Sequence, residues 1–305
     1  MMERIDKINT RFLNINYKIK KTLGIFGFII PALLVLFLIF IFPLVNSFWL
    51  SFHRWNLITP PRFVGIKNYL MIFSDPVFWT SMKNTSIFSV VSFCIEITLA
   101  FFIAQLLNHK EVKGKAIWHA IFILPMMLTP VVLSSMWRAY LNREFGIANF
   151  LLTSIHLQAH AWTMESKTAI WTLIFVEVWH KTSFFILVIS AGIVSLPKDV
   201  FEAVEIDGAR YWQKTRMITI PMLTPVFRVA GLFQMIELIR IFDKVYILTE
   251  GGPGRSTSTL SFIIFERSFH GWQMGWGAAM SYLLIFITMI VAVFLIRGVK
   301  TEVMR

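Results

Sequence analysis

The sequence predicts an all-α polytopic membrane protein with six transmembrane helices, and three observations lead to this fold class. Hydrophobic residues make up 56% of the 305 residues and charged residues only 15%, whereas soluble domains average about 45–50% and about 25%. The mean hydropathy is +0.67. Several apolar runs reach the length of about 20 residues that a helix needs to cross a bilayer. This composition excludes a disordered chain, and a single cysteine excludes a disulfide-stapled secreted module.

The first predicted span covers residues 23–48, because no charged residue lies between Lys21 and His53. Its apolar run is far longer than the roughly 7–15 residues of a signal-peptide core, so we expect a retained anchor. The other predicted spans are 85–107, which contains Glu96, and 117–137, 169–196, 218–237 and 276–296. Glu177, His180 and Lys181 lie in the fourth of the six spans, and Arg228 lies in the fifth.

Lys and Arg predict the orientation, because they are enriched in cytoplasmic loops. Six of them, from Arg4 to Lys21, precede the first span. We therefore expect both termini in the cytoplasm, with a basic N-terminal segment at 1–22 and a six-helix permease domain at 23–305. The formal net charge of +12 then indicates contact with the lipid bilayer and cytoplasm, and no nucleic-acid binding.

The loop between the fourth and fifth spans, residues 195–221, predicts two short amphipathic helices. Pro197 and Asp199 suit the first turn of a helix, and Val200, Phe201 and Val204 share one face. Gly208 is free to end this helix with a positive φ. Connections between neighbouring helices need only about 2–8 residues, so this loop has a further role. From the residues alone, it is either an interfacial helix on lipid or a docking surface.

A resemblance to a known family favours the docking surface. Glu202-Ala203-Val204, Asp207-Gly208-Ala209 and Ile218-x-Ile220-Pro221 resemble the EAA motif of permeases from binding-protein-dependent ABC transporters. The sequence departs from the usual motif at Val204, Thr215 and Ile220. Segments 63–69, 75–85, 124–137 and 242–260 are similar to further parts of the carbohydrate-uptake permeases, so the resemblance extends over nearly the whole chain.

The resemblance implies the type I ABC importer permease fold in a bacterial or archaeal cell (inner) membrane. It implies a second homologous permease, two ATPase subunits and an extracytoplasmic solute-binding protein as partners, and a sugar as substrate. The chain contains no Gly-x-x-x-x-Gly-Lys-Ser/Thr phosphate loop. We therefore expect no enzyme activity and no cofactor in this chain, with ATP–Mg at the ATPase subunits. The expected ATPase-coupling residues are Glu202, Ala203, Asp207, Gly208, Ala209 and Pro221.

Polar residues at membrane depth are candidates for the substrate path, because ionisable groups there are costly and usually face a bundle interior or a water path. The candidates are Glu177, Trp179, His180, Gln234 and Glu237. For Glu177 we also expect a structural alternative, namely a pair with Lys181 four residues along the same helix. The specific sugar does not follow from the sequence.

The last predicted outer loop resembles the outer gate of the family and contains Asp243, Gly251, Gly252 and Pro253. Its glycines and proline predict a tight turn. We expect no metal site, although His156 and His160 are four residues apart, and we expect Cys94 in the core of the second span. An ion-coupled carrier or an intramembrane enzyme stays open as the alternative function. It would use Glu96, Glu177 and His180, but the sequence shows no inverted repeat.

Overall fold

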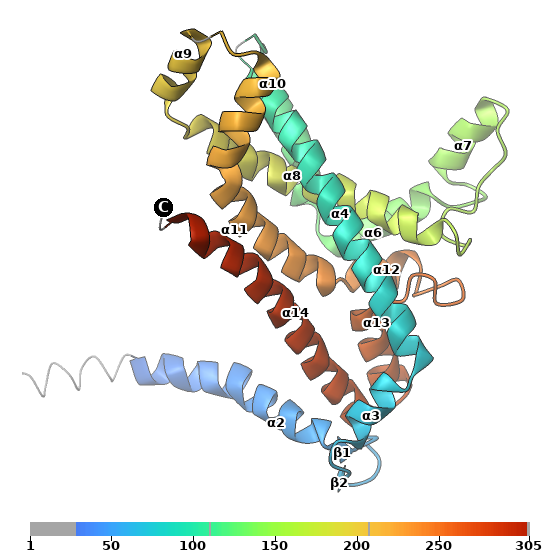
Figure 1. The fold of residues 1–305 in the computed structure, drawn as a ribbon. Coiled ribbons are helices and arrows are strands. Elements are labelled where there is room, and N and C mark those ends of the chain that lie inside the picture. Colours follow the sequence, from blue (N-terminus) through green and yellow to red (C-terminus); the bar gives the residue numbers. More distant parts are fainter. Residues whose placement is uncertain (1–28, 110, 207, 304–305) are drawn as a thin grey trace, which may run out of the picture.

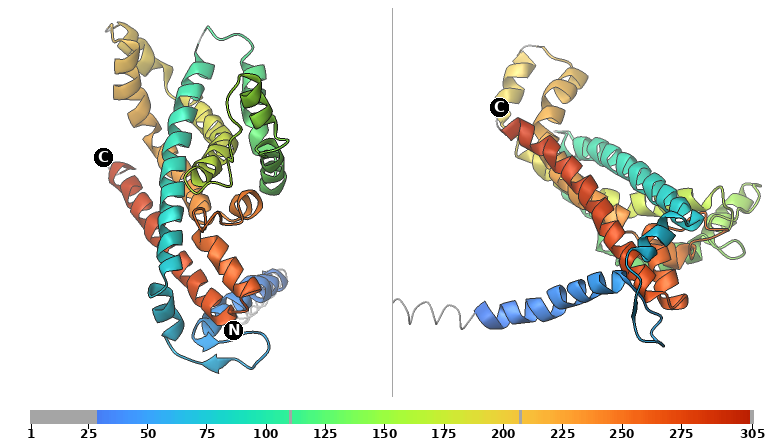
Figure 2. Two further views of the ribbon diagram at one scale, coloured as in Figure 1. Left: turned by 90° about the vertical axis from the view of Figure 1, so that its right-hand side faces the viewer. Right: turned by 60° about the horizontal axis from the view of Figure 1, so that its bottom comes forward.

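The fold is organised around α4 (Pro76–Asn108), the longest helix among the described residues, which runs the length of the molecule (Figures 1 and 2). The computed structural model describes residues 29–109, 111–206 and 208–303. Asp75 caps the start of α4 by accepting a hydrogen bond from the Val77 N–H at 2.9 Å, and Pro76 fits the first turn. Helices α8 (Ala169–Val194) and α11 (Ile220–Ile239) both pack against α4.

Five helices of the described residues are long and apolar enough to cross a membrane. They are Ile29–Ser51, Pro76–Asn108, Ala169–Val194, Tyr211–Ile239 and Met274–Ile296. The first contains the π-helix η1 (Phe37–Ile41) and α2 (Phe42–Ser51), and the fourth joins α10 (Tyr211–Lys214), the π-helix η3 (Thr215–Thr219) and α11. The last lies in α14 (Met274–Val303). These helices confirm five of the predicted spans, although residues 23–28 lie outside the described residues.

The third predicted span, 117–137, corresponds to a bent pair of helices that together are long and apolar enough to count as a sixth span. It consists of α5 (Lys115–Ile123), the 3-10 turn η2 (Leu124–Met127) and α6 (Pro130–Tyr140). The two halves are bent by 95°. Pro130 explains the break, because proline removes a backbone donor and disfavours the helical conformation of the residue before it, and Thr129 is extended with a ψ of 148°.

The predicted outer end carries short elements that hydropathy does not reveal. Strands β1 (His53–Arg54) and β2 (Arg62–Phe63) pair antiparallel, with His53 opposite Phe63. The short helices are α3 (Lys67–Phe73), α7 (Ile147–Ser154), α12 (Asp243–Leu248), α13 (Leu260–Phe265) and the π-helix η4 (Glu266–His270). At the opposite, predicted cytoplasmic end lie α9 (Lys198–Ile206) and α10 (Figure 1).

Polar side chains on the outer half of α4 hold the last outer loop. Asn84 Nδ2 donates to the carbonyls of Arg255 at 2.9 Å and Ser258 at 3.0 Å. The Leu260 N–H donates to Thr85 Oγ1 at 3.0 Å. The amide and hydroxyl groups of α4 thus satisfy backbone groups that would otherwise be buried without partners. They fix a loop more than 170 residues away in the sequence.

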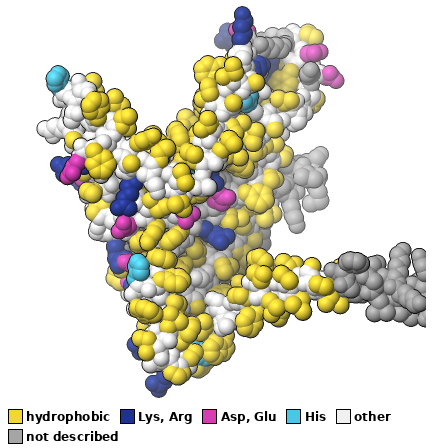
Figure 3. All heavy atoms as spheres, turned by 180° about the vertical axis from the view of Figure 1, so that it is seen from behind, with side chains coloured by type: hydrophobic (Ala, Val, Ile, Leu, Met, Phe, Trp, Pro, Cys, Tyr) yellow, Lys and Arg dark blue, Asp and Glu magenta, His cyan; other side chains and the backbone are white. Residues whose placement is uncertain are grey.

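The helix Ile29–Ser51 leaves the rest of the fold, and none of its most apolar window is buried (Figures 1 and 2). Hydrophobic side chains cover most of the face shown in Figure 3, including this helix. Such a surface suits lipid or another membrane subunit. Cys94 is exposed on α4, so its predicted place in the core is wrong.

We predict that Gly275→Ala destabilises the outer end. A Cβ on Gly275 would lie 1.8 Å from the His53 carbonyl oxygen. The substitution would therefore push the backbone of α14 away from β1 and should lower the free energy of unfolding by about 3 kcal/mol. Gly254 has a φ of +57°, and nothing lies within 4 Å of a Cβ placed there. Gly254→Ala, the control, should cost only the left-handed strain of about 1 kcal/mol. The midpoint temperature of the detergent-solubilised permease checks this, and equal shifts would contradict the close contact between α14 and β1.

Candidate translocation and coupling sites

The predicted coupling segment forms a projection at the inner end of the molecule (Figure 1). Helix α9 carries Glu202 and Ala203, and both are exposed. Gly208 has a φ of +72°, which confirms the predicted left-handed corner after the first short helix. Ala209 follows it, and its N–H donates to the Val204 carbonyl at 3.2 Å. Asp207 lies outside the described residues.

The predicted apolar face of α9 is wrong in part. Phe201 is half-buried, with the Lys214 ammonium 5.6 Å from its ring centre, and Val204 is also half-buried. Val200 and Ile206 are the exposed large apolar side chains, at 37% and 86% exposure. The exposed side chains of α9 available to a partner are therefore Val200, Glu202, Ala203 and Ile206.

Two side chains of α10 hold the coupling segment against α4. Tyr211 Oη donates to Gln105 Oε1 at 3.1 Å. The Trp212 ring packs edge-on against Phe102, with ring centres 6.2 Å apart. The chain then continues through η3 into α11, and Pro221 lies in the first turn of α11. Helix α10 thus connects the projection to α4 and α11 together.

A buried ion pair joins the outer helix α12 to the membrane helix α8. Lys244 Nζ of α12 donates to Glu177 Oε2 of α8, and both side chains are 2% exposed. Isolated charges in an apolar interior are strongly disfavoured, so each group depends on the other. The pair attaches α12 to α8.

His180 extends this ion pair to the break in the third span. Lys244 Nζ lies 3.0 Å from His180 Nδ1, and His180 Nε2 lies 3.2 Å from the Leu128 carbonyl. An ammonium only donates, so Nδ1 accepts and the proton lies on Nε2, which donates to Leu128. Leu128 follows η2, so one network connects α12, α8 and the bend between α5 and α6.

The remaining charged and polar candidates form two further contacts between helices. Gln234 Nε2 of α11 donates to Glu96 Oε2 of α4 at 2.9 Å, and both residues are buried. Lys181 of α8 forms an ion pair with Glu237 of α11. Glu237 is well exposed, at 59% of its side chain. Of the path candidates, therefore, Glu177, His180 and Gln234 are buried with partners, while Glu237 reaches the surface.

The predicted pair between Glu177 and Lys181 is wrong, because each has a partner on another element. Glu177 pairs with Lys244, and Lys181 pairs with Glu237. Lys244 is the residue that sequence reasoning missed, since it lies in a predicted outer loop. The available sequence signal was local, because the apolar Val245 and Leu248 lie one and four residues after Lys244. In the structure all three are buried on the inward face of α12.

The predicted outer gate begins in α12 and continues through the chain that follows it, and we call residues 243–259 the gate loop. Asp243 is the exposed first residue of α12. The Gly252 N–H donates to the Thr249 carbonyl at 2.9 Å, which confirms the tight turn. Gly251 has a φ of +76°, and a Cβ there would lie 2.5 Å from the Phe262 ring. Pro253 accepts a hydrogen bond from Ser166 Oγ at 3.4 Å, so the gate loop contacts the loop before α8.

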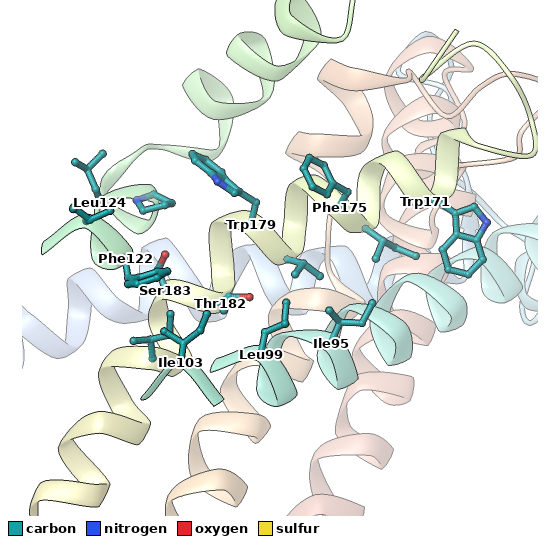
Figure 4. Close-up of a pocket in the computed structure, with 15 residues that line it drawn as sticks. Ile95, Leu99, Ile103, Phe122, Leu124, Trp171, Phe175, Trp179, Thr182 and Ser183 are labelled. Atoms are coloured by element: carbon teal, nitrogen blue, oxygen red, sulfur yellow. The ribbon is translucent and has the colours of Figure 1, made fainter. Parts of the chain in front are cut away.

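Trp179 faces an apolar groove of about 760 Å³ between α4, α5 and α8. Trp171, Phe175 and Trp179 project into it from α8, and Ile95, Leu99 and Ile103 approach from α4 (Figure 4). Thr182 and Ser183 are the only hydroxyl-bearing residues among the 15 that line it. A sugar needs many hydrogen-bond partners, so this groove suits an apolar occupant.

No group of three or more His, Cys, Asp or Glu side chains that could hold a metal ion occurs within residues 29–109, 111–206 and 208–303. The expectation of no metal and no cofactor stays a prediction.

Residues 96–301 match the family described as the inner membrane component of binding-protein-dependent transport systems. The chain belongs to this family. The predicted resemblance to carbohydrate-uptake permeases is confirmed, and the chain is an inner-membrane permease. This membership does not favour an ion-coupled carrier or an intramembrane enzyme.

Named sugar-transport permeases are similar to this chain over most of its length. The trehalose/maltose transport system permease protein MalF of Thermococcus litoralis is 33% identical, over 88% of this chain and 92% of the relative. The trehalose transport system permease protein SugA of Mycobacterium tuberculosis is 30% identical, over 89% and 87%. A permease chain in the crystal structure of a bacterial ABC transporter for alginate import superposes with a TM-score of 0.82 at 19% identity, over 93% of this chain and 98% of that chain. This likeness confirms the predicted importer fold.

We predict that Lys244→Met destabilises the permease more than the double change Lys244→Met with Glu177→Gln. The single change leaves a buried carboxylate without its cation, which costs about 3–5 kcal/mol, whereas removing both charges costs less. Thermal unfolding of the solubilised complex measures the difference. As a control, Glu250→Gln breaks an exposed ion pair with Arg138 and should cost about 1 kcal/mol or less. Equal losses in the single and double variants would contradict the dependence of each charge on the other.

Proposed function

We propose that this chain is one of two homologous permease subunits in an ATP-driven sugar importer, and that it forms half of the translocation path. The exposed coupling segment at the inner end, with the EAA-type residues Glu202, Ala203, Gly208 and Ala209, is the observation that carries the proposal. The names of the trehalose and maltose relatives support a sugar or sugar-like solute as substrate. The exposed helix Ile29–Ser51 supports a second membrane subunit.

In this proposal α9 docks onto a cytoplasmic ATPase subunit. Its exposed side chains are suited to a cleft, because Val200 and Ile206 are apolar and Glu202 is acidic. ATP–Mg binds to the two ATPase subunits and this chain is not an enzyme. Movement of the docked α9 reaches α8 through residues 195–197, and it reaches α4 and α11 through α10.

At the outer end, an extracytoplasmic solute-binding protein delivers the sugar to the gate loop that contains Asp243, Gly251, Gly252 and Pro253. A solved relative of the same fold is an alginate transporter in complex with an alginate-bound periplasmic protein. Of the path candidates, Glu237 has a well-exposed side chain, whereas Trp179 lines the apolar groove. The other path candidates have a structural role in this proposal. The buried contacts of Glu177, His180 and Gln234 fix the positions of α8, α11 and α12, which surround the path.

Reconstitution in proteoliposomes tests the assembly. The chain is combined with a second permease, the ATPase and the binding protein encoded with it, and uptake of labelled trehalose, maltose and related sugars is measured with and without ATP. We expect ATP-dependent uptake of at least one sugar by the full complex and none by this chain alone with ATP. Uptake by the isolated chain would overturn the proposal.

We predict that Glu202→Lys and Gly208→Val uncouple the ATPase from transport while the permease stays in the membrane. The first reverses the charge of the docking face, and the second places a β-branched residue at a φ of +72°. Insertion should survive, since the apolar spans drive it. The ratio of ATPase to permease and the sugar uptake are the readouts.

Matched controls lie in the connection between α4 and α5, which is also at the predicted cytoplasmic end. Glu111→Lys makes the same charge change at an exposed acid, and Gly114→Val makes the same backbone change at a φ of +66°. Both controls should keep the ATPase and transport. If the α9 variants also transport normally at normal subunit ratios, the segment is only an interfacial connector.

We also predict that Glu237→Gln lowers sugar uptake severalfold without loss of subunits. The change removes an exposed charge from the ion pair with Lys181 in the proposed path. Glu165→Gln, an exposed acid in an outer loop, serves as the control. Unchanged rate and sugar affinity in the Glu237 variant would place the path elsewhere.

A further inference from the structure

A small polar pocket lies at the outer end, between the loop that precedes α8 and the gate loop. Its volume is about 260 Å³. Arg138 contributes from the end of α6, Arg143 from the following turn, Trp162 and Thr163 from the segment before α8, and Thr249 and Glu250 from the gate loop. We call it the outer pocket. It joins two loops that are about 90 residues apart in the sequence.

Hydrogen bonds hold the walls of the outer pocket in place. Arg138 Nη1 donates to the Ile247 carbonyl at 3.0 Å and lies 3.5 Å from Glu250 Oε1. The buried Asn149 donates to the Arg143 carbonyl at 3.2 Å and accepts from Trp162 Nε1 at 3.1 Å. The pocket is therefore formed before any ligand arrives, as small-molecule sites usually are.

The backbone of Glu250, in the wall of the outer pocket, adopts a strained left-handed conformation. Its φ is +50°, a conformation that a residue with a side chain rarely adopts. Its N–H donates to the Val245 carbonyl at 2.9 Å, which keeps the turn in this form. Strained residues concentrate at ligand sites, where the surrounding structure compensates for their cost. Here the strain holds a carboxylate beside the Arg138 guanidinium in the pocket wall.

The chemistry of the pocket matches a hydroxyl-rich ligand. Guanidinium and carboxylate groups form strong, planar hydrogen bonds, Thr163 and Thr249 add hydroxyls, and Trp162 adds an aromatic surface against which the apolar face of a sugar can pack. The larger groove beside Trp179 lacks such groups, because only Thr182 and Ser183 offer hydroxyls there. A volume of 260 Å³ equals about nine water molecules, which is enough for one sugar ring.

We propose that the outer pocket is a reception site for one ring of the imported sugar, occupied as the sugar leaves the binding protein and before it enters the membrane. Arg143 and Glu250 bind ring hydroxyls, and Trp162 supports the ring. The proposal rests on the proposed function as a sugar importer. It places a sugar-binding site outside the membrane, on the gate loop itself.

Protection of a single thiol from labelling tests the site in the full complex. In a Cys94→Ser background, Thr163→Cys places a thiol in the pocket wall. Lys167→Cys places one on the same loop outside the lining residues. Both are labelled with a methanethiosulfonate reagent, with and without the sugar that the wild-type complex imports from the trehalose and maltose panel. We expect the sugar to slow labelling at Thr163→Cys at least threefold and to leave Lys167→Cys unchanged.

A second measurement separates sugar binding from docking of the binding protein. Arg143→Gln should weaken protection at Thr163→Cys by about tenfold in sugar concentration while the complex still binds the binding protein. Equal labelling of both thiols with and without sugar would overturn the site, as would protection by sugar-free binding protein alone. If the wild-type complex imports no sugar at all, the proposed function fails and the site fails with it. Normal import without protection refutes the site alone.

Discussion

The buried ion pair between Lys244 and Glu177 is the constraint on which the outer half of the structure depends. An ammonium and a carboxylate that are both 2% exposed are tolerated in an apolar interior only as partners. Helix α12 therefore cannot leave α8 without exposing two charges to apolar surroundings. His180 adds the break of the third span to the same network. Lys244 lies at the start of the gate loop, so its ion pair with Glu177 fixes the position of the gate loop relative to α8.

The inner half is held differently, by contacts that stay accessible. Tyr211 and Gln105 are joined by one hydrogen bond near the surface, and Trp212 and Phe102 by one edge-on ring contact. Exposed contacts of this kind are weaker than a buried ion pair. The permease thus combines a firmly attached outer end with an inner projection that contacts little of its own chain. This difference suits the proposed mechanism, in which the ATPase moves α9 at the inner end while the gate loop stays attached to α8.

The accuracy of the sequence predictions follows the range of the interactions involved. The long spans were predicted because mean hydropathy is a local property, and the corner at Gly208 was predicted because its signals lie within a few residues. The pair of Glu177 with Lys181 was a local expectation from helix periodicity, and a partner 67 residues away in the chain replaced it. The bend before Pro130 had a local signal, namely the proline itself. The continuous apolar run nevertheless led to the prediction of one unbroken span. Hydropathy also cannot tell a lipid-facing side of a helix from a packed side, which is why Cys94 was misplaced.

We expect α12 to move with α8, because the ion pair attaches the gate loop to the helix that leads to the coupling segment. Spin labels at Leu187→Cys, an exposed position on α8, and Asp243→Cys on α12, in a Cys94→Ser background, measure the distance between α8 and α12 in the reconstituted complex by pulsed electron resonance. We predict one narrow distance distribution that stays the same when a non-hydrolysable nucleotide closes the ATPase, and a broad distribution after Lys244→Met. A distance that changes with nucleotide in the otherwise unaltered permease, or a distribution that Lys244→Met leaves narrow, would contradict it.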